Sequence, residues 1–188
     1  MVDKEKIKKS VKLLLEAIGD NPNREGLRDT PRRVADMYDK ILNGYEDDPK
    51  KYLTTFKAES NDMVIVKDIP FYSFCEHHLV IFFGKIHIAY IPNKKMIGLS
   101  KLVRFMRVYA KRPQVQERLT HQIADCLVKH LSKDVMVYIE AEHMCMSMRG
   151  VRTPGTKTVT SAVRGKFLNP SKNKNPKAEF LHAIGNGK

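Results

Sequence analysis

Long apolar runs, an apolar stretch near the start and an even set of cysteines are all missing from this sequence of 188 residues. No apolar run approaches the roughly 20 residues that a helix needs to span a bilayer, which argues against a membrane protein. The charged start, residues 1–6, has no stretch typical of a signal peptide. Three cysteines are too few for a secreted disulfide framework. We therefore expect a cytoplasmic protein whose reduced thiols are available to bind a metal.

Repeats, low-complexity segments and Gly/Ser linkers are also absent, and 188 residues are hardly enough for two domains. Acidic residues are outnumbered, with 21 against 34 Lys and Arg. The net charge of +13 attracts nucleic acid, membrane phosphates or a phosphorylated small substrate, although general solubility explains it equally well. The basic stretch 172–177 is interpreted as a solvated loop, because it lacks the aromatic residues of a single-strand-binding surface.

The spacing of apolar residues predicts two helices first, and then pairs of strands and helices in alternation. The first helix is predicted over Lys4–Ile18. The start signal Thr30-Pro31 predicts a second helix that ends before Gly44. Further along the chain the pattern predicts strands over 63–69 and 79–91, helices over 100–111 and 113–131, and strands over 135–148 and 156–167.

This order of elements predicts an α+β protein. We expect an N-terminal helical region, residues 1–60, followed by a single unit, residues 61–188, in which an antiparallel sheet carries helices on one face. So small a sheet leaves its edges open, and we expect oligomerisation to cover them.

Two short motifs carry residues that bind metals. Cys75 and His78 have C-x2-H spacing just beyond a predicted strand, as in zinc knuckles. One face of the predicted strand 135–148 is apolar up to Ala141 and then presents His143 and Cys145. This change from apolar to metal-binding residues along one strand face favours a shared metal site over the alternative that the four residues are unrelated.

Each of these residues also has an ordinary structural interpretation, since a lone cysteine is usually a small core residue. We assign Cys126 to that role, and we assign structural or surface roles to His87, His121, His130 and His182. Thiolate and imidazole ligands together suit zinc, and three protein ligands leave it an open position. Zinc there lowers the pKa of water to about 7, and spare histidines can move protons, as in a hydrolase.

Five motifs in this order resemble the GTP cyclohydrolase I family over most of the chain. They are the segments 29–38 (DTPRRVADMY), 75–78 (CEHH), 97–101 (IGLSK), 112–120 (RPQVQERLT) and 143–150 (HMCMSMRG). The resemblance implies a zinc-dependent hydrolase that converts GTP and water to 7,8-dihydroneopterin triphosphate and formate. It also implies the tunnelling fold, in which subunit sheets close into a barrel, and a homodecamer of two stacked pentamers with no nucleic-acid or membrane partner.

The resemblance assigns roles to the motif residues one by one. Cys75, His78 and Cys145 resemble the zinc ligands, and His77 and His143 the two catalytic histidines. In the family an imidazole protonates N7 of the purine, a role that we give to His143, while His77 is given the ribose chemistry. Two polar residues placed near the ribose and base complete the catalytic set: Ser100 and Gln116.

Substrate recognition is expected from an acid and several cations. Glu117 aligns with the residue that recognises guanine, since a carboxylate accepts N1–H and the 2-amino hydrogens; its alternative role is to stabilise a helix N-terminus. Lys101 and Arg104, three apart on one predicted helix, share a face beside free backbone N–H groups. Arg149 lies on the predicted strand face of His143 and Cys145, and Arg33 is the family's further phosphate-side arginine.

Two other functions remain open at this point. A basic, zinc-stabilised nucleic-acid-binding module predicts four ligands and no open position. The tunnelling-fold nitrile reductase of the queuosine pathway predicts Cys75 as a metal-free nucleophile and requires a nicotinamide cofactor. The chain also begins directly with its first helix, without the long regulatory segment of some animal members, so we expect a bacterial-type enzyme that feeds folate synthesis.

Overall fold

The computed structural model describes residues 2–172 and 174–185. Its helices are α1 (Lys4–Ala17), α2 (Thr30–Ile41), α3 (Leu99–Ala110), α4 (Gln116–His130), α5 (Met144–Ser147) and α6 (Pro176–Gly185), with short 3-10 turns η1 (Asn43–Tyr45), η2 (Pro49–Tyr52) and η3 (Gly165–Phe167). Its strands are β1 (Thr55–Lys57), β2 (Val64–Cys75), β3 (Ile81–Tyr90), β4 (Lys95–Ile97), β5 (Pro113–Gln114), β6 (Val135–His143) and β7 (Lys157–Val163).

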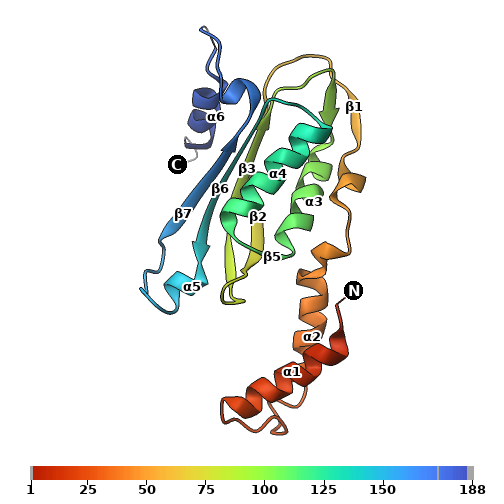
Figure 1. Ribbon diagram of the computed structural model, residues 1–188, viewed down its shortest axis with the longest axis vertical. Helices are drawn as coiled ribbons and strands as arrows, with labels where there is room; N and C mark the ends of the chain where they lie inside the picture. The colour runs from red at the N-terminus through yellow and green to blue at the C-terminus, as the bar shows by residue number, and fades with distance from the viewer. Residues whose placement is uncertain (1, 173, 186–188) are drawn as a thin grey trace.

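The main sheet has five strands in the order β5-β2-β3-β6-β7 (Figure 1). β2 pairs with β3, β3 with β6, and β6 with β7, and all three pairs are antiparallel. β5 adds two residues parallel to the end of β2. β1 and β4 form a separate antiparallel pair. The predicted antiparallel sheet is confirmed, and so is the α+β class.

The main core lies between one face of this sheet and the helices α3 and α4 (Figure 1). Alternate residues of β3 and β6 point into it, such as Phe82, Ile86 and Ile139, each with none of its surface exposed. From α4, Leu119 and Ile123 pack against them. The predicted helices on one face are therefore confirmed.

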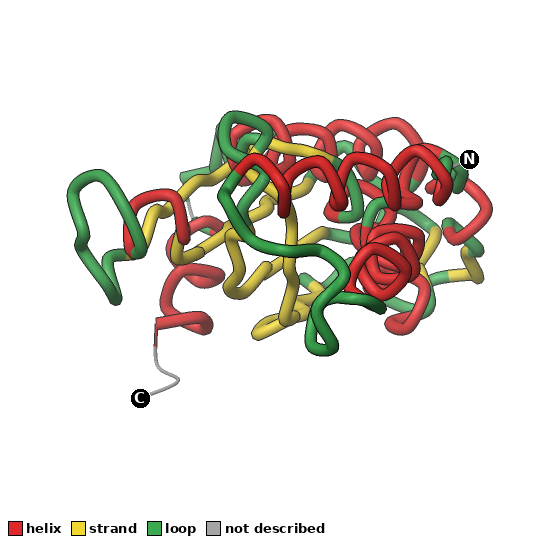
Figure 2. Tube along the Cα trace, turned by 90° about the horizontal axis from the view of Figure 1, so that it is seen from below, coloured by secondary structure: helices red, strands yellow, loops and turns green. Residues whose placement is uncertain are grey.

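A second, smaller cluster covers part of the opposite face of the sheet. Phe180 of α6 and Phe167 of η3 are fully buried there with Ala89 and Met136, the strand neighbours of core residues. Seen from below, α6 lies across the strands from the longer helices (Figure 2). The sequence interpretation missed α6, since it took residues 172–177 for a loop and predicted no element after them.

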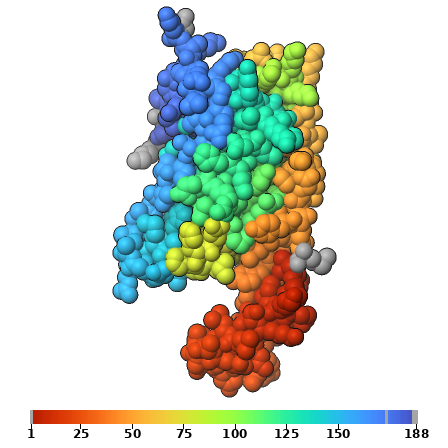
Figure 3. All heavy atoms as spheres, in the orientation of Figure 1, coloured from red at the N-terminus to blue at the C-terminus, as the bar shows by residue number. Residues whose placement is uncertain are grey.

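The N-terminal helices α1 and α2 pack on one another as a hairpin that extends away from the sheet (Figures 1 and 3). α1 buries no residue, and α2 buries only Ala35. Leu14 and Ile18, two residues of the apolar stripe that predicted α1, are 60% and 68% exposed, so part of this stripe is left open within one chain. No helix among the described residues is long and apolar enough to cross a membrane.

Five predicted boundaries were wrong. The strand predicted over 63–69 continues to Cys75 as β2, and the strand predicted over 156–167 ends at Val163 as β7. The strand predicted over 135–148 ends at His143, because its partner β3 begins at Ile81 and Phe82 is the last residue paired with it. The helix predicted from Pro113 begins at Gln116, after β5. Gly44 lies buried in η1 rather than just beyond α2, which ends at Ile41.

Candidate active site

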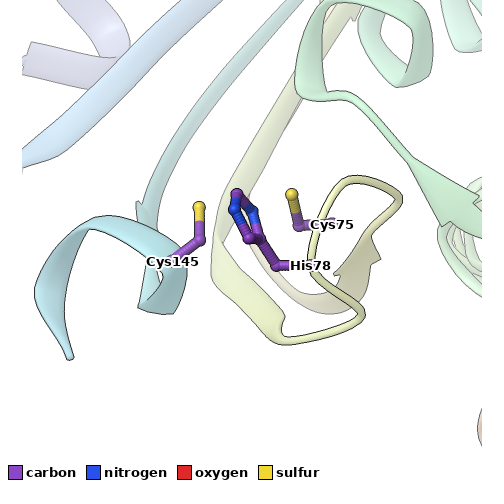
Figure 4. Close-up of side chains that lie close together, drawn as sticks. All are labelled: Cys75, His78 and Cys145. Atoms are coloured by element: carbon purple, nitrogen blue, oxygen red, sulfur yellow. The ribbon is translucent and has the colours of Figure 1, made fainter. Parts of the chain in front are cut away.

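Cys75, His78 and Cys145 meet at one end of the sheet (Figure 4). One potential ligand atom from each lies within 4.8 Å of the others. Cys75 is the buried last residue of β2, His78 belongs to the turn that follows, and Cys145 lies on α5. A borderline-soft cation such as Zn²⁺ fits this set of two thiols and one imidazole.

The tight turn between β2 and β3 brings Cys75 and His78 to the same side. The Leu79 N–H donates to the Cys75 carbonyl over 2.8 Å, and the Cys75 N–H donates to the Val80 carbonyl over 2.8 Å. Leu79 takes a positive φ of 52°, which reverses the chain there. C-x2-H spacing thus works here because the intervening residues form a closed turn.

Cys145 reaches the site by a different route from the one its sequence spacing indicated. It does not share a strand face with His143, because the chain turns into α5 immediately after His143. The Met148 N–H donates to the Met144 carbonyl and closes this helical turn. Burial raises the pKa of the Cys145 thiol, and the neighbouring Cys75 raises it further, while Arg149 lowers it. A divalent cation between the two sulfur atoms would reverse this effect and favour the thiolates.

His143, at the end of β6, is held from two sides. Its Nε2 lies 2.8 Å from Oε1 of Gln116, and its ring stacks on Phe82 with centroids 4.6 Å apart. Burial lowers the pKa of His143 from its ordinary 6.5, and the nearby negative charge of Glu117 opposes this. The ring is therefore favoured in its neutral form near neutral pH.

The first turn of α4 carries Gln116, Glu117 and Arg118, and each of them interacts with His143 or with the turn after β2. Glu117 is exposed, with its charge acting on His143. Arg118 forms a two-pronged ion pair with Glu76, one contact of which is 3.0 Å, and so holds the turn between β2 and β3, the candidate metal-binding turn, against α4. Arg118 also lowers the pKa of the Glu76 carboxyl.

Gln116, expected near the ribose and base, has its side chain directed into the protein in this single chain. Its side chain is only 1% exposed and is bonded to His143 and to β6 and β7. His77, by contrast, is exposed in the turn beside His78, with ring centroids 6.4 Å apart.

The predicted phosphate-binding cations are scattered within one chain. Arg149 donates to Nε2 of His78 and so lies at the metal ligands. An arginine has donors only, so a metal that takes this nitrogen must displace the guanidinium. Arg33, on the exposed side of α2, forms an ion pair with Asp29 at 3.5 Å.

Ser100, Lys101 and Arg104 lie on the first turns of α3, toward the opposite end of the sheet (Figure 1). The last turn of α3 leads to β5, which pairs with the Cys75 end of β2. A rise of about 1.5 Å per residue places Ser100 about 15 Å along the helix from that end. One chain therefore does not bring these three residues to the metal ligands.

Three hollows of about 630, 130 and 480 Å³ lie elsewhere on the chain. The largest is between the start of β2 and α6, and Arg104 lines the smallest. Cys75, His78 and Cys145 line none of the three.

Sequence reasoning missed the residues that hold the site rather than form it. Phe82 and Thr160 lie outside the quoted motifs, and Thr120 ends one of them, but none of the three has a signal of its own, because apolar and Thr residues are ordinary in helices and strands. Glu76 and Arg118 stand inside the quoted motifs, but their pairing joins positions 42 residues apart and is visible only in the fold.

Comparisons with known proteins find relatives that match over most of the chain. A sequence model of the GTP cyclohydrolase I family matches residues 7–185. The chain is 59% identical over 177 residues to GTP cyclohydrolase 1 of Clostridium perfringens strain 13, which covers 93% of this chain and 96% of the relative. It is 60% identical over 170 residues to the protein of the same name from Carboxydothermus hydrogenoformans, covering 89% and 88%. Among solved structures, an archaeosine synthase QueF-Like in the apo form matches 57% of this chain and 97% of its own, with 16% identity and a TM-score of 0.47.

Proposed function

This chain belongs to the GTP cyclohydrolase I family, and on that premise we propose how its residues convert GTP and water to 7,8-dihydroneopterin triphosphate and formate, the first step of pterin and folate biosynthesis. The observation that carries the proposal is the meeting of Cys75, His78 and Cys145 within 4.8 Å, beside a buried histidine. The predicted tunnelling fold is that of this family.

Zinc is the proposed resident metal, held by Cys75, His78 and Cys145. Two thiolates and one imidazole suit zinc, and three protein ligands leave one position open. When bound, zinc supplies Lewis-acid activation of water at neutral pH. The alternative in which Cys75 is a metal-free nucleophile does not explain why two other metal-binding side chains face it. The binding-module alternative requires a fourth ligand, and the group found among the described residues has three.

His143 and His77 are the proposed proton carriers. Burial keeps His143 neutral near neutral pH, so it can take a proton and deliver it to N7 of the purine. His77 is exposed in the metal-binding turn and is assigned the ribose chemistry. Glu117 is proposed to accept hydrogen bonds from N1–H and the 2-amino group of guanine, which adenine cannot offer.

The remaining residues support a site completed by neighbouring subunits. Ser100, Lys101 and Arg104 lie far from the metal ligands of their own chain, which favours their service to a neighbour's site. We assign triphosphate binding to Lys101, Arg104, Arg149 and Arg33. β7 and most of β2 form open edges of the main sheet, and a barrel of sheets in a cytoplasmic homodecamer would pair them.

The decisive experiment measures formate release and, after oxidation, the fluorescent pterin from GTP with zinc-loaded protein. We expect both products and one zinc per chain; a chelator should abolish activity, and added zinc should restore it. Cys145→Ala should lose zinc and activity together, whereas Cys126→Ala, the remaining free cysteine, should keep both. Zinc-loaded protein that leaves GTP intact would refute the proposal.

A further inference from the structure

The His143 ring has one nitrogen, Nε2, in contact with the side-chain amide of Gln116. A neutral imidazole carries hydrogen on only one nitrogen, so the atom that Gln116 presents decides which nitrogen is free. If Gln116 presents its amide oxygen, Nε2 must carry the hydrogen and donate it. If Gln116 presents its NH₂ group, Nε2 must be bare and accept. The orientation of the Gln116 amide must therefore be settled from its other contacts.

Two backbone carbonyls settle that orientation. The other end of the Gln116 amide lies 3.1 Å from the Ile139 carbonyl oxygen and 3.0 Å from that of Thr158. Carbonyl oxygens only accept, so the atom facing them must be the NH₂ group. A flipped amide would press its own oxygen against both carbonyls, in a side chain that is 1% exposed and beyond the reach of water.

Two threonines fix the same orientation independently. The Thr120 hydroxyl donates to the Gln116 backbone carbonyl over 2.7 Å, which uses its single hydrogen. The two threonine hydroxyls are 2.7 Å apart, so the Thr160 hydroxyl must donate its hydrogen to the Thr120 oxygen. The Thr160 oxygen is then left to accept from Gln116 Nε2 over 3.1 Å. These hydrogen-bond directions are all satisfied only when Gln116 Oε1 points to His143.

We infer that Gln116, supported by Thr120 and Thr160, is a positioning residue whose Oε1 accepts a hydrogen bond from Nε2–H of His143 and leaves Nδ1 of that ring to exchange a proton with the substrate. Phe82 complements this by fixing the plane of the ring, since the two rings stack within 5° of parallel. The inference rests on the proposed function for the identity of the substrate. It replaces a direct contact between Gln116 and the ribose or base.

Nitrogen NMR of the zinc-loaded protein, labelled with ¹⁵N at its histidine rings, tests the tautomer without any activity measurement. The seven histidines give few signals, and His143→Gln identifies those of His143 by their loss. At about pH 8, where an imidazole is neutral, we expect Nε2 of His143 to be protonated and Nδ1 to be bare. A bare Nε2 overturns the inference, whether or not the protein acts on GTP.

Kinetics of variants test the positioning role. Gln116→Met should lower kcat by about 10²-fold, within the usual contribution of a proton-transfer group, and leave KM for GTP and the zinc content unchanged. Thr160→Val should lower kcat by less, and Thr160→Ser should restore it because it keeps the hydroxyl. Gln122→Met, on the same helix and bonded to Gln114, is the matched control and should leave both constants unchanged.

A rise in KM with kcat unchanged in Gln116→Met would show a direct substrate contact and overturn the inference. So would equal kcat in Thr160→Val and Thr160→Ser. Absence of GTP turnover in the unmodified zinc-loaded protein would instead refute the proposed function, and the NMR result would still decide the tautomer.

Discussion

Phe82 and His143 lie face to face, with ring centroids 4.6 Å apart and planes inclined by 5°. The two residues are partners in the β3–β6 register, so the strand pairing itself produces the stack. Phe82 is fully buried, and an aromatic residue that belongs to the core thereby fixes the plane of the proposed proton carrier.

Phe82→Leu should leave His143 bonded to Gln116 but free to tilt. We expect kcat to fall by about tenfold with zinc content unchanged, because a small misplacement of a proton carrier is costly. Stability should fall by about 1–3 kcal/mol from lost core packing and stacking. Steady-state kinetics and denaturant unfolding measure the two effects. Phe105→Leu, equally buried in the same core, should cost similar stability and spare kcat; an equal loss of kcat there would assign the effect to general destabilisation.

Arg118→Gln should loosen the metal-binding turn by breaking its ion pair with Glu76. Residues that orient a metal site typically contribute 10–100-fold to metal affinity, and we expect a loss of about tenfold. Competition with a chromophoric chelator measures it. Arg164→Gln, which breaks the ion pair between Arg164 and Asp125 of α4 away from the metal ligands, should leave zinc affinity intact. Unchanged affinity in Arg118→Gln would limit the ion pair to a surface role.

Glu117→Ala should lose recognition of guanine and retain zinc. A site built to pair hydrogen-bonding groups loses about 10³-fold or more when a partner is missing, so kcat/KM for GTP should fall by this order. Kinetics and zinc analysis of the same preparation check both halves. Asp125→Ala, an exposed acid on the same helix, serves as the control. If zinc falls together with activity, the division between ligands and recognition residues is wrong.

Mixed oligomers should reveal a site shared between subunits. Lys101→Ala and His143→Ala should each be nearly inactive alone. Co-expressed, they should regain part of the activity, because an interface can combine an intact Lys101 from one chain with an intact His143 from another. The specific activity of mixed against separate preparations is the measurement. A mixture no more active than its parents would place both residues in one chain's site.

His87 should make stability depend on pH. Burial lowers its pKa from 6.5, against the opposing charges of Asp68 and Glu140 and with the aid of Lys85 and Lys67. The unfolded chain then binds more protons than the native one just below pH 6.5, so stability is complete above about pH 6.5 and falls as the pH drops toward the native pKa. His87→Gln should make this fall shallower. Denaturant unfolding of the metal-free protein across this range checks it, and equal slopes would contradict the assignment.

Predictions from the sequence succeeded where the determining contacts are local. α1 and α2 follow from a 3.6-residue apolar period and from Thr30-Pro31, and the structure confirms both helices. The C-x2-H motif identified Cys75 and His78 as a pair, because a turn of that length has little choice in where it points. The resemblance to the GTP cyclohydrolase I family is confirmed, while the roles of the individual site residues stay predictions.

Only the tertiary structure decided the rest, because each remaining feature depends on a partner distant in the sequence. Residues 143–148 alternate in a way that suits a strand, but β6 has no partner beyond Phe82 on β3, so the chain turns and Cys145 reaches the metal ligands from a helix. The orientation of Gln116 depends on carbonyls 23 and 42 residues away. The sequence by itself determined which side chains are candidates to bind a metal and the substrate. The ends of the strands and the buried hydrogen bonds decided where those side chains point, since both arise from pairings between segments that no local pattern records.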